Sequence, residues 1–337
     1  MRNVIVVGVH RGLNEVEPLD IKQMVGRSGR MGIDTKGDAY VLLPKTKFIR
    51  YKTWCENIPP INSTMNDQDI LAFHIISEIA EGEIFDVPSL MEWYNRSLAA
   101  FQNNFLDRVE AEELLSKLEK LSVIQRQKTI FKITNLGRVA AYLYLSPYSI
   151  ANWYTNFSKI FSEDKLDEYS LSWALSNIPD NDDNFIDKDL KKEIEDYRKK
   201  CHLKNLFISN GSASIGFIYW SCLTFNEFVP EQKRKQVKFD FERVSTALEM
   251  IDKMYANWNK GIFWKKLQLR IEYEITEEQT ELCELKGIGG IRARILFNEG
   301  IKSIEDFRRK KFLAKDIIGE ELYERICSEN KEKLNIN

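Results

Sequence analysis

The apolar residues of the first 45 positions follow a strand, helix, strand pattern. Residues 4–9 are an almost continuous run of branched apolar side chains, which is typical of a buried parallel strand. A helical stretch is expected over 21–30 and a second strand over 38–43, closed by Pro44. Two strands and one helix are too few for a domain, so the pattern predicts the last βαβ unit of a larger α/β sheet whose earlier strands are missing.

The next hundred positions change from polar linker to helices and then to a hairpin. Residues 45–66 are polar and irregular, and Pro59-Pro60 indicates a linker. Apolar helices follow, after which residues 130–134 alternate like a hairpin strand and Gly137 leads into a helix over 138–145. Helices followed by a small β hairpin predict a winged-helix domain.

Residues 147–265 are expected to be helical throughout, and the strongest pattern lies over 239–258. Six large apolar residues recur there at alternating spacings of three and four, namely Phe241, Val244, Leu248, Ile251, Tyr255 and Trp258. That spacing predicts one long helix whose apolar stripe packs into a core. Arg243, Met250 and Asn257 repeat every seven residues on another side of the same helix.

Composition narrows the class of protein. The 337 residues carry 30% charged side chains and a formal net charge of −2, which excludes a globally basic coat but leaves room for a local basic patch. No apolar run reaches about 18 residues, so no transmembrane helix is expected. Five cysteines without a Cys-x-x-Cys pair and three scattered histidines predict neither a disulfide framework nor a zinc site. We therefore expect a protein of a reducing, intracellular compartment.

The first motif with chemical content is Gln23-Met-Val-Gly-Arg-Ser-Gly-Arg30. Arg27 and Arg30 lie three residues apart beside Gly26 and Gly29, at a helix end. Planar guanidinium groups suit a triphosphate because they offer paired donors and a permanent charge, and the glycines allow close approach. The alternative is an arginine-rich helix end that binds nothing.

The second motif is Lys286-Gly287-Ile288-Gly289, followed by Arg292 and Arg294. The glycines allow a tight turn whose backbone N–H groups point outward at the start of the next helix, which predicts a site for one phosphate, read without regard to base. Residues 286–311 carry eight Lys or Arg against three Asp or Glu, a local excess of +5. The alternative is a plain packing unit with a solvated basic face.

Taken together, these motifs resemble the C-terminal part of superfamily-two DNA helicases of the archaeal Hjm repair type, relatives of the helicase half of polymerase theta. Residues 23–30 are similar to their motif six, with Ser28 in place of the usual alanine. Five further stretches resemble the family in the same order: Gly37–Val41, Thr134–Arg138, Tyr144–Pro147, Arg270–Tyr273 and Leu285–Asn298. The resemblance also implies a location that is cytoplasmic and nucleoid-associated, or nuclear.

The resemblance implies an ATP site that is only partly present in this sequence. Gln23 would meet the γ-phosphate region, and Arg27 and Arg30 would act as arginine fingers across a cleft. The sequence contains no Gly-Lys dipeptide, hence no Walker loop, and no Asp-Glu-x-His box. ATP and Mg²⁺ are therefore expected to bind only together with a missing motor portion, on another chain or fragment.

The resemblance also implies that the helix at 239–258 is a ratchet that follows a single strand. Arg243 matches an arginine that contacts a phosphate in the family. Met250 stands where the family has a base-stacking tryptophan, and it offers packing without an aromatic plane.

The sequence therefore predicts a mainly α protein. The resemblance implies that it is the C-terminal portion of an ATP-dependent 3′-to-5′ DNA helicase. Such a helicase would act on single-stranded or forked DNA in repair and replication restart. Two alternatives remain open: a non-catalytic nucleic-acid-binding adaptor, and part of a related RNA helicase. The expected segments are 1–45, the end of a RecA-like motor domain; 46–67, a linker; 68–146, a winged helix; 147–265, a helical ratchet domain; and 266–337, a helix-hairpin-helix domain.

Overall fold

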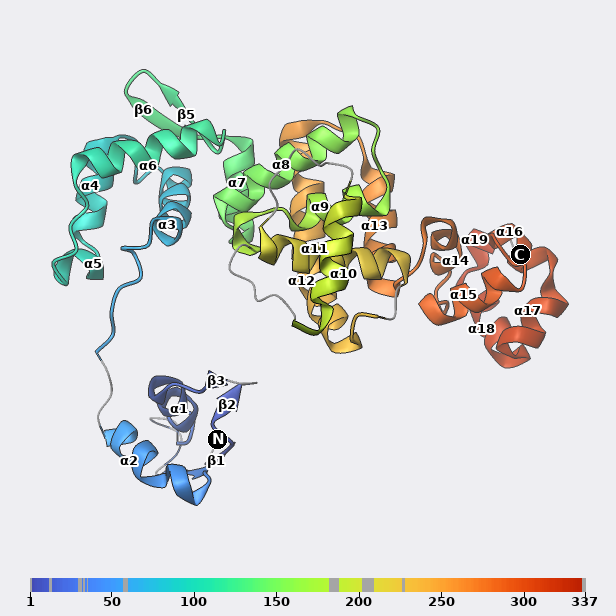
Figure 1. Ribbon diagram of the computed structural model, residues 1–337, viewed down its shortest axis with the longest axis horizontal. Helices are drawn as coiled ribbons and strands as arrows, with labels where there is room; N and C mark the ends of the chain where they lie inside the picture. The colour runs from blue at the N-terminus through green and yellow to red at the C-terminus, as the bar shows by residue number, and fades with distance from the viewer. Residues whose placement is uncertain are drawn as a thin grey trace. The chain divides into compact units, whose positions relative to one another are not determined.

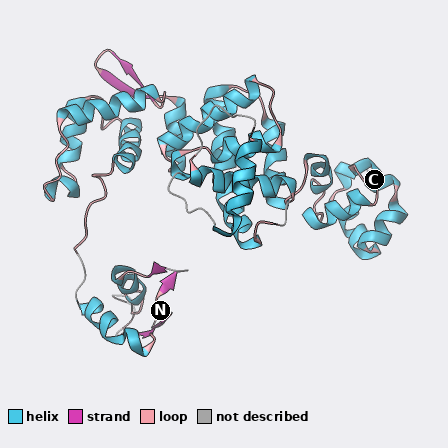
Figure 2. Cartoon of the chain, in the orientation of Figure 1, coloured by secondary structure: helices cyan, strands magenta, loops and turns pink. Residues whose placement is uncertain are grey.

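The computed structural model describes residues 2–11, 14–29, 32, 34, 36–56, 60–181, 188–201, 209–225 and 228–334. The chain folds as two compact units, Met1–Ser63 and Thr64–Asn337. Helices dominate both the element order and the ribbon, which confirms the mainly α prediction (Figures 1 and 2). No described helix is long and apolar enough to span a bilayer.

The first unit is built on a parallel strand pair. β1 (Asn3–Val7) pairs with β4 (Asp38–Leu42), with Val6 opposite Val41, and α1 (Pro18–Val25) lies between them in sequence. β2 (His10–Arg11) and β3 (Asn14–Glu15) form a short antiparallel pair. The predicted strand, helix, strand order is confirmed. The helix starts before residue 21, because a proline that presets helical φ stands at its first position, and it ends at Val25.

The prediction that residues 45–66 are irregular is wrong in its first half. A short 3-10 turn, η1 (Lys45–Lys47), leads into α2 (Phe48–Glu56). Tyr51 of α2 is buried with Val9, Val16 and Ile21, so this helix completes the small core of the first unit.

The second unit opens with four helices, a hairpin and a fifth helix. They are α3 (Gln68–Glu81), α4 (Val87–Asn95), α5 (Leu98–Phe101), α6 (Arg108–Lys120), β5 (Ile124–Gln127), β6 (Ile130–Ile133) and α7 (Asn135–Leu143). The strands pair antiparallel, as predicted. α7 starts three residues before the predicted position because the Thr134 side chain accepts a hydrogen bond from the backbone N–H of Gly137 and caps the helix.

A helical bundle follows in the same unit. Its elements are α8 (Pro147–Ser162), α9 (Glu168–Ser176), η2 (Pro179–Asn181), η3 (Lys188–Leu190), α10 (Lys191–Lys200), α11 (Asn210–Thr224), α12 (Glu231–Ile251) and α13 (Gly261–Tyr273). One hydrophobic core contains buried residues from Leu71 to Ile271, so it runs without a break past position 146.

The long helix α12 confirms the predicted stripe and corrects its limits. Phe241, Val244, Leu248 and Ile251 are buried. The helix starts at Glu231, well before residue 239, and after Ile251 it widens into η4, a π-helical turn over Asp252–Ala256. Asn257 has φ of 54° and lies beyond the helix, so the predicted seven-residue repeat stops at Met250.

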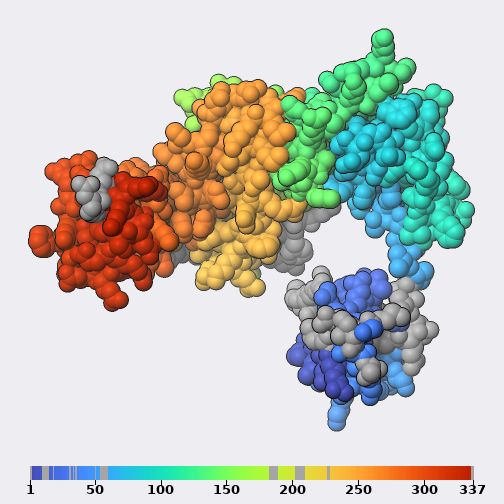
Figure 3. Space-filling model, turned by 180° about the vertical axis from the view of Figure 1, so that it is seen from behind, coloured from blue at the N-terminus to red at the C-terminus, as the bar shows by residue number. Residues whose placement is uncertain are grey.

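The remaining helices form a second core. They are η5 (Glu277–Gln279), α14 (Thr280–Cys283), α15 (Gly290–Asn298), α16 (Ile304–Arg309), α17 (Lys311–Ile318), α18 (Glu320–Glu329) and α19 (Lys331–Leu334). Their buried side chains begin at Ile275, whereas Trp264, Leu267 and Ile271 of α13 belong to the bundle core. The predicted limit at 266 therefore falls inside α13. Figure 3 shows the C-terminal side chains packed into one body.

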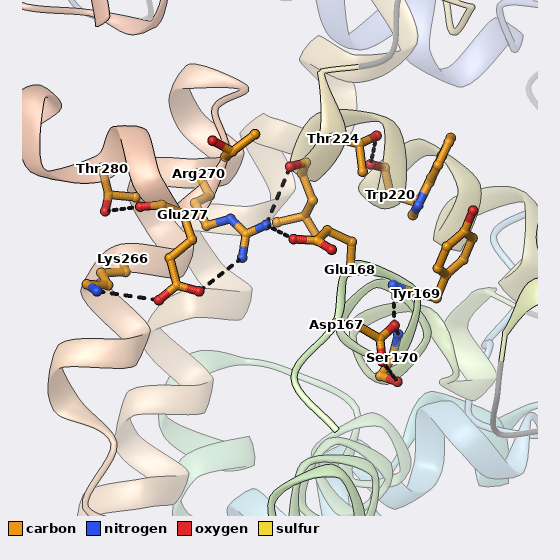
Figure 4. Close-up of polar contacts among 12 residues, drawn as sticks. Asp167, Glu168, Tyr169, Ser170, Trp220, Thr224, Lys266, Arg270, Glu277 and Thr280 are labelled. Atoms are coloured by element: carbon orange, nitrogen blue, oxygen red, sulfur yellow. Dashed lines mark hydrogen bonds and ion pairs between the residues drawn. The ribbon is translucent and has the colours of Figure 1, made fainter. Parts of the chain in front are cut away.

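A buried arginine joins the bundle to this C-terminal body. Arg270 is 3% exposed, and its Nη2 donates to Oε1 of Glu168 at 2.6 Å, from α9 (Figure 4). Its Nη1 lies 4.0 Å from Oε2 of Glu277 in η5, which Lys266 also approaches. Because a buried cation needs partners, these contacts favour one arrangement of α9, α13 and η5.

Candidate nucleotide and nucleic-acid sites

The arginine motif lies at the end of α1. The chain leaves this helix in a tight turn, in which the backbone N–H groups of Gly26, Arg27 and Ser28 donate to carbonyls of the last helical turn. The Ser28 hydroxyl also donates to Val25 O. Gln23 and Arg27 are exposed, and no described residue makes a hydrogen bond or ion pair with the Arg27 guanidinium. Arg30 lies outside the described residues.

Gly29 has a structural reason for being glycine. Its φ is +69°, and a Cβ built on it would stand 2.9 Å from the backbone nitrogen of Gly37. A Cβ on Gly37 would in turn stand 2.3 Å from the nitrogen of Gly29. The two backbones therefore touch, and this contact fixes the turn that follows Arg27 beside the start of β4. Gly26 has an ordinary helical φ of −64° and carries no such constraint.

Arg243 lies on the solvent side of α12 and is bonded to α7. Its Nη2 donates to the carbonyl oxygens of Leu143 and Tyr144, both at 2.9 Å. Met250, on the same helix, is half-buried and packs against the core. The structure thus leaves Arg243 accessible and shields part of the Met250 side chain.

The glycine turn between α14 and α15 is held by hydrogen bonds with Asn330 and Arg292. Gly287 has φ of +99°, which only glycine adopts readily. The N–H of Lys286 donates to Oδ1 of Asn330 at 2.8 Å, and Arg292 Nη1 donates to Gly287 O at 3.0 Å. α15 follows Gly289 without a side-chain hydrogen bond from a capping residue, and Tyr273 packs against Gly289 and Gly290 at this positive end of the helix.

Arg292 and Arg294 do not share one surface, contrary to the expected phosphate site. Two residues apart on a helix means opposite sides. Arg292 is exposed at the turn, whereas Arg294 Nη1 donates to the carbonyls of Tyr273 and Glu274, at 3.3 and 2.9 Å. The Arg294 guanidinium also lies 3.6 Å above the Phe225 ring. Arg294 therefore connects the C-terminal body to the bundle, and only Lys286, Gly287, Gly289 and Arg292 gather at the turn.

A hollow of about 540 Å³ beside the hairpin was not foreseen from the sequence. Its lining includes Arg126, Asn135, Arg138 and Tyr255. Arg126 is paired with Glu119 at 3.5 Å, but Arg138 is exposed and bonds to no described residue. The feature of the sequence that could have indicated this hollow is Arg138, the last residue of the Thr134–Arg138 stretch that resembles the family.

Comparisons with known proteins give one consistent result. No protein-family model matches the chain. It is 28% identical to the ATP-dependent DNA helicase Hel308 of Methanocaldococcus jannaschii, over 95% of this chain and 27% of that protein. Hel308 of Methanococcus vannielii is 26% identical over 97% of the chain and 52% of its own length. Hel308 of Thermoplasma acidophilum is 25% identical over 90% of the chain and 46% of its own length.

The chain thus spans about half or less of the length of the curated relatives it matches. The resemblance that the motifs predicted is confirmed: along nearly its whole length, this chain is similar to the C-terminal part of archaeal Hel308 DNA helicases.

Proposed function

We propose that this chain is the C-terminal portion of an ATP-dependent 3′-to-5′ DNA helicase, which grips single-stranded or forked DNA and contributes arginines to a shared ATP site. The observation that carries the proposal is similarity to Hel308 helicases over 88–99% of the chain. The direction of movement and the role in repair and replication restart follow from that resemblance.

On the nucleotide side, the proposed groups are Gln23, Gly26, Arg27, Gly29 and Arg30. The exposed Arg27 fits a triphosphate, since it offers planar donors and a charge that no described residue neutralises. ATP with Mg²⁺ would supply the phosphoryl group, and the arginines would stabilise charge that develops on its oxygens. The phosphate loop and the metal ligands would come from the motor portion that this sequence lacks.

The nucleotide part is tested by phosphate release. Purified chain with single-stranded DNA and Mg²⁺–ATP should show only background hydrolysis, because arginines without a phosphate loop have no bound substrate to act on. Arg27→Ala should give the same background. Turnover near one per second that survives repurification would overturn this division of roles.

On the DNA side, the proposed contacts are Lys286, Gly287, Gly289 and Arg292 at the α15 turn, together with Arg243 and Met250 on α12. The turn presents uncapped backbone donors and a positive dipole end, a combination that binds phosphate without reading bases. Binding should therefore be independent of sequence and should weaken as salt rises.

The DNA part is tested by titrating labelled oligonucleotides at about 50 and 200 mM salt. Arg292→Ala should weaken binding and make the slope of log affinity against log salt shallower by about 0.7, the value for one phosphate of a single strand. Lys120→Ala removes an exposed charge on α6 and serves as the control. Equal affinities at both salt concentrations would contradict phosphate contact.

A further inference from the structure

Two exposed aromatic residues lie close to Arg243. Phe239 precedes it by one turn of α12, so both side chains lie on one helix face, and Phe239 is 78% exposed. The second is Tyr144, whose carbonyl accepts a bond from Arg243 and which is 72% exposed. Neither aromatic residue is buried in a core, so both are open to a ligand that reaches Arg243.

Tyr144 is held in place although it is exposed. Its φ of 53° is uncommon for a residue with a side chain, and the bonds from Arg243 Nη2 to the Leu143 and Tyr144 carbonyls close the end of α7 around it. Its ring lies 5.9 Å from that of Phe73, which meets His74 edge to face at 5.4 Å. The ring is therefore backed by other rings on α3 and needs little ordering when a ligand arrives.

Arg243 keeps donors for a ligand. Only its Nη2 is used within the described residues, so Nε and Nη1 carry no protein partner there. Asp240 and Glu242 are exposed on the same helix and limit the favourable region to about one phosphate. Most of the affinity at this place must then come from the rings.

We propose that Tyr144 and Phe239 are base-stacking residues close to Arg243, so that a DNA single strand places one phosphate on the guanidinium and neighbouring bases on the two rings. A cation with exposed aromatic residues close to it suits the alternation of phosphate and base in a single strand. The inference rests on the proposed function and adds to it the groups that stack on the bases. Met250 is half-buried and offers no open surface for stacking.

The test compares two oligonucleotides of about 16 nucleotides, one of thymidines and one of abasic sites, with equal numbers of phosphates. In the full chain, Tyr144→Leu and Phe239→Leu should each weaken oligo(dT) binding by about tenfold, within the range measured for loss of one stacked base. Both should leave the abasic oligonucleotide within about twofold, and Tyr144→Phe should bind oligo(dT) like the unaltered chain. Phe101→Leu, at an 84% exposed ring on α5, is the matched control.

The outcomes separate this site from the function on which it rests. Unchanged oligo(dT) binding by both leucine variants, or equal losses on both oligonucleotides, overturns stacking while the proposed function stands. Failure of the unaltered chain to bind either oligonucleotide overturns both. If Tyr144→Leu disturbs the end of α7, Phe239→Leu still decides the question, because residue 239 is an exposed position inside a helix.

Discussion

At the scale of single residues, Asp252 determines where the bundle turns. The side chain is 4% exposed and accepts three hydrogen bonds of 2.8 Å, from the backbone nitrogens of Asn259 and Lys260 and from Nε1 of Trp264. Those donors lie at the start of α13, so one carboxylate connects the end of α12 to the next helix.

We expect Asp252→Ala to lower the free energy of unfolding by about 2–4 kcal/mol, because it leaves buried donors without an acceptor. Urea titration followed by tryptophan fluorescence measures it. Asp240→Ala, at an exposed position of α12, should change stability by less than about 0.5 kcal/mol. A loss below about 1 kcal/mol for Asp252→Ala would mean that water replaces the carboxylate.

Three buried thiols make stability sensitive to alkaline pH. Burial raises the pKa of Cys201 to about 11 and those of Cys222 and Cys283 to about 12. In the unfolded chain these thiols ionise near pH 9, whereas in the folded chain they stay protonated. The contribution of these thiols to stability is therefore full below pH 9. It falls from pH 9 to about 11 for Cys201 and to about 12 for Cys222 and Cys283, by at most about 1.4 kcal/mol per pH unit for each thiol.

The measurement is the free energy of unfolding at pH 7, 9 and 10. Cys222→Ala should flatten the decline above pH 9 even though it lowers stability overall. Identical slopes for the variant and the unaltered chain would exclude this thiol as a cause. Mass-spectrometric mapping should also find the three thiols slow to alkylate until urea is added.

The sequence predicted exposed arginines better than it predicted which of them share a surface. Motif spacing singled out Arg27 and Arg243, and both are exposed. It grouped Arg292 with Arg294, but residues two positions apart on a helix face opposite ways. Tyr144 was part of a stretch that resembles the family, but its exposure could not be predicted because it depends on a left-handed helix end.

At the scale of elements, α7 lies very close to Val123, the residue before β5, and to Ile133 at the end of β6. A Cβ on Gly137 would stand 2.0 Å from the carbonyl oxygen of Val123 and 2.6 Å from Cδ1 of Ile133. Gly261, the first residue of α13, has no atom within 4 Å of the same built position. The two helices thus give a matched pair of glycines, one packed and one open.

Gly137→Ala should destabilise the chain by about 2–3 kcal/mol, because the added methyl pushes α7 away from backbone that cannot move easily. Gly261→Ala should be neutral or stabilise by up to about 1 kcal/mol, since it only restricts the unfolded chain. Thermal melts followed by circular dichroism compare them. Similar midpoints for both variants would show that α7 can shift freely.

Periodicity predicted elements wherever an apolar stripe was long. It found the buried face of α12 but missed the first turns of that helix, where charged residues from Glu231 onward carry little pattern. It also missed α2, because Tyr51, the buried side chain that the structure describes on this helix, was too weak a signal against polar neighbours. The π-helical turn at Asp252 depends on tertiary hydrogen bonds, so local sequence did not indicate it.

At the scale of the whole molecule, each hydrophobic core is built from its own range of the sequence. The small core uses Val9, Val16, Ile21 and Tyr51, whereas the buried residues of the two large cores run from Leu71 to Leu334. The predicted winged-helix and ratchet segments share one of these cores, so they are one folding body even though their sequence patterns differ.

A fragment of residues 64–337 should therefore fold without the rest. We expect its main thermal transition within about 2 °C of that of the full chain, since no described residue before Thr64 belongs to either large core. Every group proposed to contact DNA lies in this fragment, so its affinity for oligo(dT) should stay within about twofold of that of the full chain. Gln23 and Arg27 lie in the part removed, so the experiment also separates the proposed nucleotide contacts from the DNA contacts. A loss of affinity beyond about tenfold, in a fragment with an unchanged melting midpoint, would contradict this division. It would mean that residues 1–63 contribute to DNA binding as well as to the proposed nucleotide contacts.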